Sequence, residues 1–152
     1  MKEFENLTDI QLMGLCIERE AGGELLEGKI AVGTVIMERV DYRDWDGKTI
    51  KEVILKPWQF SWTMSKAGED YYNEAVDIAS NFLNELNRRS SLAVSYAIAM
   101  GLIEGKIPRD PDLSKVHCCQ YLNPKVAGKT KKKWLASGMK VIKVIGNHEF
   151  YV

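Results

Sequence analysis

The sequence has no long apolar run, no excess of charge of either sign and few cysteines. Its 21 basic and 21 acidic residues give a formal net charge of zero, so no overall positive field exists to attract nucleic acid or an anionic membrane. The longest run of apolar and small residues, Ile30 to Met37, is too short to cross a bilayer. We therefore expect neither a nucleic-acid partner nor insertion into a membrane.

Cysteine and histidine are also scarce. The three cysteines, Cys16, Cys118 and Cys119, are odd in number, and a disulfide between the adjacent two would be strained. We expect no disulfide framework and synthesis in a reducing compartment. The two histidines, His117 and His148, are fewer than the three protein ligands that a catalytic zinc usually takes, and no H-E-x-x-H motif is present. The sequence thus predicts no metal site and no cofactor.

The N-terminal stretch "MKEFENLTDI" lacks the apolar core of a signal peptide. We therefore expect synthesis in the cytoplasm without a signal peptide. A chain of 152 residues with 45% hydrophobic residues can bury a core of its own. Without an internal linker, repeat or low-complexity segment, residues 1–152 are expected to form a single domain, and we expect a monomer.

Periodicity and capping signals predict helices over residues 8–21, 25–40, 49–56, 69–88 and 91–103. Thr8 and Gln11 have the spacing of a capping box, and Gly22-Gly23 is expected to end the first helix. A loop is expected at 105–115, and strands at 117–122 and in "KVIKVIGNHEFYV". The lysine cluster at 129–133 is expected in a solvated loop or helix start. The fold class is therefore α+β, dominated by helices and with a small antiparallel sheet.

Three glutamates lie within "CIEREAGGE" around the end of the first helix. On a helical wheel Glu20 falls at the edge of the apolar face, whereas Glu18 falls on the polar side and is expected to be solvated. Burial and the unfavourable end of the helix dipole would both raise the pKa of Glu20, as a general acid requires. Glu24 is expected to cap the second helix, which leaves it as a secondary, structural carboxylate.

The segment "EAGGELLEGKIAVGTVIMERV" resembles the signature of the SleB/CwlJ family of cell-wall hydrolases. "TIKEVILKPWQFSW", "YLNP" and "IGNHEFY" are similar to three further blocks of that family, and all four occur in family order. The chain departs from the pattern at Arg19 and Gly22, where the family has Gly and Arg, and at Glu38, where it has Asn. Family members are best known from spore germination, and related sequences occur as phage lysins.

The resemblance implies a lysozyme-like catalytic domain that cleaves the glycan strand of peptidoglycan between N-acetylmuramic acid and N-acetylglucosamine. It implies that Glu20 is the catalytic residue. With one strong carboxylate, we expect a lytic transglycosylase that leaves 1,6-anhydro-muramyl ends. The alternative is a hydrolytic muramidase or glucosaminidase with a second carboxylate. Asp44, Asp46, Glu69 and Asp70 are expected at the surface.

The other predicted substrate-binding residues come from the remaining family blocks. If "WQFSWT" is extended, Trp58, Phe60 and Trp62 share one side and pack inward, while Gln59 and Ser61 face a sugar-binding cleft. Tyr121 and Asn123 offer a hydroxyl and an amide to sugar groups, and His148 is expected at the cleft wall.

Other classes of protein are also compatible with the sequence. Cys118 or Cys16 with His148 would suit a wall peptidase, and a module that binds glycan without cleaving it would share the cleft. A zinc amidase is the weakest alternative because only two histidines exist. We expect action on the cell wall, as for a phage lysin released through a membrane hole by a holin-type protein.

Overall fold

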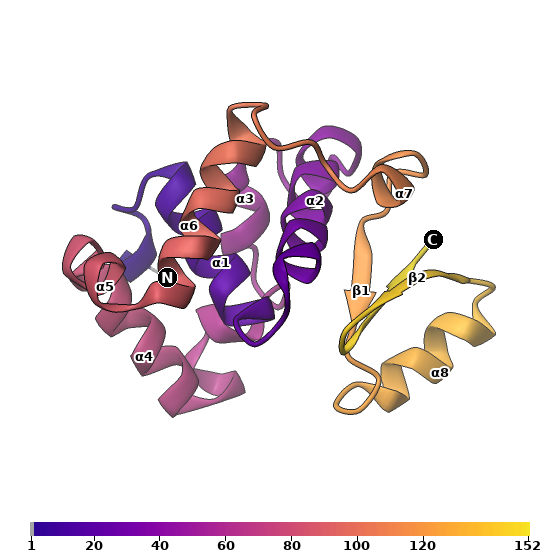
Figure 1. The fold of residues 1–152 in the computed structure, drawn as a ribbon. Coiled ribbons are helices and arrows are strands. Elements are labelled where there is room, and N and C mark those ends of the chain that lie inside the picture. Colours follow the sequence, from indigo (N-terminus) through magenta and orange to yellow (C-terminus); the bar gives the residue numbers. More distant parts are fainter. Residues whose placement is uncertain (1) are drawn as a thin grey trace.

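The computed structural model describes residues 2–152 (Figure 1). Its α-helices are α1 (Asp9–Ala21), α2 (Leu26–Tyr42), α3 (Ile50–Leu55), α4 (Glu69–Ser80), α5 (Phe82–Arg88), α6 (Ser90–Ile103), α7 (Pro111–Ser114) and α8 (Gly128–Ala136). Short 3₁₀ turns lie at Lys2–Phe4, Ser61–Thr63 and Ser65–Ala67, and the strands are β1 (Gln120–Leu122), β2 (Val141–Ile145) and β3 (His148–Tyr151). Within the described residues no helix is both long and apolar enough to span a membrane.

Helix α1 is the centre of the helical part and packs against α6, α2 and α3 (Figure 1). The predicted capping box fixes its start: the Thr8 hydroxyl accepts the Gln11 N–H, and the Gln11 side chain accepts the Thr8 N–H. Gly14 permits the close approach of α6, because a Cβ there would lie 2.9 Å from the Cα of Tyr96. The buried side of α1 belongs to the main hydrophobic core. The helix ends at Ala21, which leaves Glu20 in its last turn.

The three strands form one antiparallel sheet in the order β1-β3-β2. Tyr121 on β1 lies opposite Phe150 on β3, and β2 and β3 are joined at Gly146-Asn147 as predicted. Helix α8 packs beside the sheet, with the Trp134 ring 5.1 Å from that of Tyr151 in an edge-on contact. The sheet and α8 lie on the far side of α2 from α4, α5 and α6 (Figure 1). Residues of β1 and of the β2–β3 turn thereby reach the end of α1.

Two predicted elements differ from the structure. The helix expected over 69–88 is two helices, because the backbone leaves the helical region at Asn81 (φ −137°, ψ 41°). The loop expected at 105–115 contains α7, whose start is capped by the Asp110 carboxylate and has Pro111 as its first residue. The lysine cluster at 129–133 lies at the start of α8, one of the two places predicted for it.

Candidate active site

Glu20 and Tyr121 meet where the end of α1 faces strand β1. The Tyr121 hydroxyl donates a hydrogen bond of 2.8 Å to Oε2 of Glu20. The Tyr121 ring is held in turn by His148 and Phe150 of β3, with ring centroids 5.1 and 5.6 Å away. The sheet therefore fixes the position of the Tyr121 hydroxyl that binds the Glu20 carboxylate.

Burial raises the pKa of the Glu20 carboxyl above its usual range. The hydrogen bond from Tyr121 and the positive charges of Arg39 and Arg19 act in the opposite direction but do not outweigh burial. Among the described residues Glu20 is the carboxyl whose pKa is shifted upward. A carboxyl held in the protonated form to a higher pH can donate a proton to a leaving group.

A pocket of about 300 Å³ opens beside Glu20. It is lined by both sides of the loop after α1, by Tyr71 of α4, and by Asn123, Asn147 and His148 from the sheet end of the molecule. Larger hollows lie elsewhere, beside Trp45 and beside Phe82, but Glu20 lines neither. The predicted residues Glu20, Glu24, Asn123 and His148 thus line one pocket, and Tyr121 joins them through its bond to Glu20.

Glu24 does not cap α2, so that prediction is wrong. The cap position is Leu25, without a side-chain hydrogen bond. Glu24 instead accepts the backbone N–H of Asn147 at 2.9 Å, and its Oε1 lies 3.7 Å from Nδ1 of His148. A Cβ at position 146 would overlap the Glu24 carboxylate, so Gly146 allows this close approach. Glu24 therefore ties the loop after α1 to the β2–β3 turn.

His148 lies at the wall of this pocket and is buried, with 7% of its surface exposed. Burial lowers the pKa of its imidazole, and the charge of Glu24 opposes this only in part. Its Nδ1 has no hydrogen-bond partner within residues 2–152. The ring is thus held neutral at neutral pH, with one nitrogen near Glu24.

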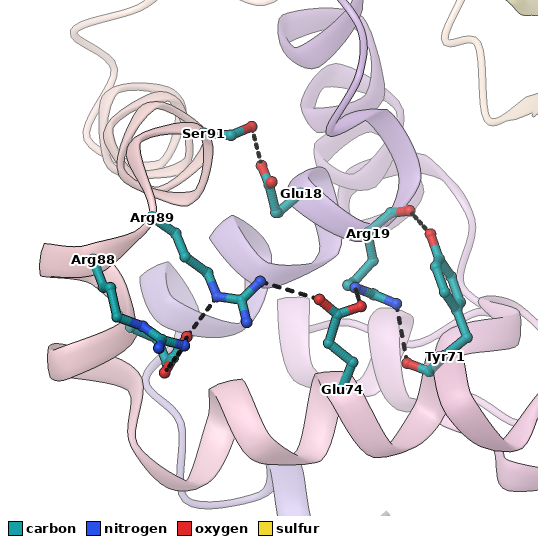
Figure 2. A network of polar contacts seen from close by, with 8 residues as sticks. Glu18, Arg19, Tyr71, Glu74, Arg88, Arg89 and Ser91 are labelled. Atoms are coloured by element: carbon teal, nitrogen blue, oxygen red, sulfur yellow. Dashed lines mark hydrogen bonds and ion pairs between the residues drawn. The ribbon is translucent and has the colours of Figure 1, made fainter.

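Glu18 is not the solvated carboxylate that the helical wheel predicted. Its Oε2 accepts a hydrogen bond of 2.9 Å from Ser91 (Figure 2). The same oxygen accepts a bond of 2.7 Å from Ser95 and pairs with Nζ of Lys29 at 3.1 Å. Ser95 and Lys29 are buried. The wheel failed because α6 covers the polar side of α1 and presents serines to it. Glu18 therefore links α1 to α2 and α6, and its role is structural.

Arg19, one of the departures from the family pattern, is fixed on α4. Its guanidinium pairs with Glu74 at 2.7 Å, donates to the Tyr71 carbonyl at 3.1 Å and lies 3.7 Å from the centroid of the Tyr71 ring (Figure 2). The Tyr71 hydroxyl donates to the Arg19 carbonyl. Arg89 extends the network by binding the other oxygen of Glu74 (Figure 2). These contacts hold α4 and the Tyr71 ring at the rim of the pocket.

The segment "WQFSWT" is not a strand with two sides, so this prediction is also wrong. Residues Ser61–Thr63 form a 3₁₀ turn, and Trp58 has a positive φ of 68°. Phe60 and Trp62 are buried as predicted, but Trp58 is 74% exposed. Ser61 is exposed and Gln59 is half-buried, and neither lines the pocket beside Glu20.

A model of the cell wall hydrolase family matches residues 23–151. The chain belongs to the cell wall hydrolase family. The catalytic domain of the germination-specific lytic transglycosylase SleB from Bacillus anthracis is similar in structure, with a TM-score of 0.62, 26% identity and coverage of 96% of this chain and 97% of that chain. The SleB catalytic domain of Bacillus cereus gives a TM-score of 0.56 and 26% identity, covering 99% of this chain and 96% of that one. Among curated protein sequences none gives a significant match.

These matches confirm the predicted fold class, a helix-dominated lysozyme-like fold with a small antiparallel sheet. They also confirm that this cell wall hydrolase is a cell-wall-lytic enzyme of the SleB/CwlJ type. Glu20 lies three residues before the segment that the family model matches. The SleB structures cover 96% and 99% of this chain, so the part aligned with them includes the end of α1, where Glu20 lies.

The thiols of this cell wall hydrolase are not arranged as nucleophiles. All three cysteines are free and buried, and burial raises the pKa of each, for Cys119 to about 11. The Cys118 thiol donates to the carbonyls of Gln120 and Tyr151. His117 faces Glu38, with Nδ1 3.0 Å from Oε2, and its ring stacks on Tyr42. These contacts argue against a cysteine–histidine peptidase.

Sequence reasoning missed two residues near Glu20. Arg39 is buried on α2, donates to the Cys119 carbonyl at 2.7 Å and has an Nη1 without a partner in the described part of the chain. Tyr71 carries no signal in the sequence, because only the tertiary contact with Arg19 brings it to the pocket.

Asp46 is the exception among the acidic residues expected at the surface. It is 2% exposed and pairs with Arg43 at 2.6 Å and Lys56 at 3.1 Å. Asp44, Glu69 and Asp70 are exposed as predicted. The buried Asp46 ties the segment after α2 to the end of α3 and lines a different hollow from Glu20.

Proposed function

We propose that this cell wall hydrolase is a lytic transglycosylase that cleaves peptidoglycan between N-acetylmuramic acid and N-acetylglucosamine, with Glu20 as the catalytic residue. The observation that carries the proposal is the Glu20 carboxyl itself, which has a raised pKa and lies in a polar pocket. The 26% identity to a SleB domain described as a lytic transglycosylase supports the same reaction.

In the first half of the reaction, protonated Glu20 donates its proton to the glycosidic oxygen, and the bond from that oxygen to the muramyl C1 breaks. Positive charge then develops at C1. Glu20 is now a carboxylate, and the hydrogen bond from Tyr121 and the nearby charge of Arg39 both favour that form. Tyr121 and Arg39 therefore stabilise the Glu20 carboxylate that remains after proton transfer.

In the second half, the C6 hydroxyl of the same muramyl sugar attacks C1, and the Glu20 carboxylate accepts its proton. A 1,6-anhydro bond forms, no water is consumed, and Glu20 returns to its starting form. One carboxyl thus serves as acid and then as base. A mechanism with a single carboxyl fits this pocket, because the other two glutamates already have partners. Glu18 pairs with Lys29 and accepts hydrogen bonds from two serines, and Glu24 accepts the Asn147 N–H.

A hydrolytic reaction is the second candidate, because Glu24 lines the same pocket as Glu20. In that case Glu24 would activate a water as the second carboxylate of a glycosidase. The hydrogen bond from the Asn147 N–H already occupies one of its oxygens, which makes the hydrolytic reaction the second choice.

Comparison of Glu20→Gln with Glu24→Gln on purified peptidoglycan tests the assignment. Loss of Glu20 is expected to slow wall clearance by about 10²–10⁴-fold, the usual contribution of a general acid. Glu24→Gln should keep measurable clearance, and Glu5→Gln, an exposed change with no side-chain bond to lose in the described residues, is the matched control. Clearance by Glu20→Gln at the rate of the control would refute the role of Glu20.

For the remaining predicted contacts, we propose that Asn123 and His148 bind sugar groups in the pocket, and that Tyr121 orients Glu20. Gln59 and Ser61 would contact the glycan strand only beyond this pocket, since they do not line it.

A further inference from the structure

The zero net charge of the chain conceals a strong separation of charge along the sequence. Residues 113–152 contain eight lysines and a single acidic residue, Glu149, and so carry a net charge of +7. Residues 1–112 contain 13 basic and 20 acidic residues and carry −7. Since residues 113–152 comprise β1, α8, β2 and β3, the positive charge is concentrated on the sheet end of the molecule (Figure 1).

Helix α8 divides its lysines between two faces. Lys131 and Trp134 face the sheet, where Lys131 pairs with Glu149 at 2.8 Å and Trp134 contacts Tyr151. At 100° per residue, Lys129, Lys132 and Lys133 fall on the opposite face. All three are exposed, and none has an acidic partner within residues 2–152. Glu149 already has Lys131, so these three charges are uncompensated.

This basic face is connected to the candidate active site. Lys125 lies between β1 and α8, and its Nζ donates to Oδ1 of Asn147 at 3.3 Å, while its N–H bonds to Asn123. Asn123 and Asn147 both line the pocket beside Glu20. A helix rises about 1.5 Å per residue, so the lysines of α8 extend from this rim over roughly one turn beyond it. Cations therefore run from the rim of the pocket out along α8.

We propose that the three exposed lysines of α8, Lys129, Lys132 and Lys133 (the α8 basic face), together with Lys125 at the rim of the pocket, bind the carboxylates of the stem peptides that peptidoglycan carries on its muramyl residues. This inference rests on the proposed function, because it takes the glycan strand as the occupant of the pocket. A muramyl sugar in the pocket projects its peptide from the strand at the point of cleavage, and neighbouring muramyl residues do the same. The substrate class is thus the peptide-bearing glycan rather than the bare glycan.

Charge and position together favour this ligand over other polyanions. The peptide carboxylates are attached along the strand that enters the pocket and recur on successive muramyl residues, whereas a phosphate polymer is attached to only some of them. Exposed cations act over about a Debye length, near 10 Å at 0.1 M salt, which suits contacts made just outside a cleft. Such contacts add affinity and association rate without taking part in bond cleavage.

The test measures binding, so that it does not depend on cleavage. Glu20→Gln and the same chain with Lys129→Gln, Lys132→Gln and Lys133→Gln are sedimented at low temperature with three insoluble ligands. The first is a wall that keeps its phosphate polymers, and the second, the peptide-bearing wall, is stripped of them. The third, the peptide-free wall, is the glycan of the second after an amidase has removed the stem peptides, coupled to beads because strands without peptide cross-links are soluble. Lys2→Gln, Lys48→Gln and Lys106→Gln, made together on the same background, are the matched control, because these lysines are exposed and lie outside the pocket.

The chain is expected to bind the peptide-bearing wall more tightly than the peptide-free wall. The triple change on α8 should weaken binding to the peptide-bearing wall roughly tenfold, which corresponds to about 1.4 kcal/mol. It should leave binding to the peptide-free wall unchanged, and 0.5 M salt should remove the difference. The control triple change should have no effect on either wall.

Three outcomes overturn the proposal. Equal affinity for the peptide-bearing and the peptide-free wall would show that the chain does not bind the stem peptides. An effect of the lysines only on walls that keep their phosphate polymers would assign the face to those polymers. A loss of self-association in the α8 variant, seen by sedimentation velocity at low salt, would assign it to the acidic part of a second copy. If instead Glu20→Gln cleaves the wall but binding behaves as expected, the catalytic assignment fails and the basic face stands.

Discussion

The Tyr121 hydroxyl donates to Oε2 of Glu20 at 2.8 Å across 101 residues of sequence. This bond joins the end of a helix in the main core to a strand of the sheet, so the two parts must dock before the pocket is complete. It also acts on the chemistry, because a donor to the carboxylate favours its charged form and offsets part of the effect of burial.

Removal of that donor should move the pH dependence of the enzyme. In Tyr121→Phe the pKa of Glu20 is expected to rise further, because burial stays and the bond is lost. Since the protonated form is the active acid, the falling limb of kcat/KM at high pH should shift to higher pH. A pH–rate profile on soluble glycan checks this, with Tyr151→Phe, whose hydroxyl binds Glu149, as the control. A limb that stays in place or moves to lower pH contradicts the account.

Glu20→Gln should be at least as stable as the unchanged chain at neutral pH. A carboxyl whose pKa is raised on folding binds its proton more tightly in the folded state, so folding stability falls as pH rises from the unfolded pKa, about 4.3, through the folded one. The amide removes this loss and can still accept the Tyr121 bond. Thermal unfolding should give the variant an equal or higher Tm at pH 7, and the gain should vanish below about pH 4. A lower Tm at pH 7 that is restored at pH 4 would have the wrong sign.

Glu18 and Lys29 should behave as a buried pair. Glu18→Ala leaves the Lys29 ammonium buried without its carboxylate and is expected to cost roughly 3 kcal/mol, a fall in Tm of about 6–12 °C. Adding Lys29→Met should restore part of this stability, because an apolar side chain has no charge to solvate. Chemical denaturation of the two single variants and the double variant measures the coupling. Additive losses would show that the two side chains do not interact.

The two tryptophans of "WQFSWT" should differ sharply. Trp62 is fully buried and contacts Phe4 edge-on at 5.3 Å, so Trp62→Ala is expected to cost roughly 3–5 kcal/mol. Trp58 is 74% exposed, and Trp58→Ala should change the free energy of unfolding by no more than about 0.5 kcal/mol. Denaturant midpoints of the two variants compare them directly, and similar losses would contradict the observed packing.

Local signals in the sequence were sufficient for parts of the fold and for the choice of Glu20. The capping box at Thr8 and Gln11 and the turn at Gly146-Asn147 are both local, and both were predicted. The periodicity of α1 likewise set Glu20 at the edge of the apolar face, where the structure has its side chain next to Tyr121.

The errors concern residues whose partners are distant in the sequence. Glu18 was expected to be exposed to solvent because a helical wheel of α1 alone contains no information about α6. In the structure α6 covers Glu18 and binds it through Ser91 and Ser95. Glu24 has the Asn147 backbone as its partner, 123 residues away. At Trp58 a local signal misled, since alternation of aromatic and polar residues predicts a strand, whereas the backbone turns there with a positive φ. The expected monomeric state and release as a phage lysin stay predictions.

The identity of the new glycan end tests the central claim most directly. Peptidoglycan is digested in water labelled with ¹⁸O, and the released muropeptides are analysed by mass spectrometry before and after borohydride reduction. A single acid–base carboxyl with attack by the C6 hydroxyl predicts 1,6-anhydro-muramyl ends that contain no label, weigh one water less than the hydrolytic product and resist reduction. Reducible ends that carry the label would contradict the account and make Glu24 the first candidate for the second carboxylate.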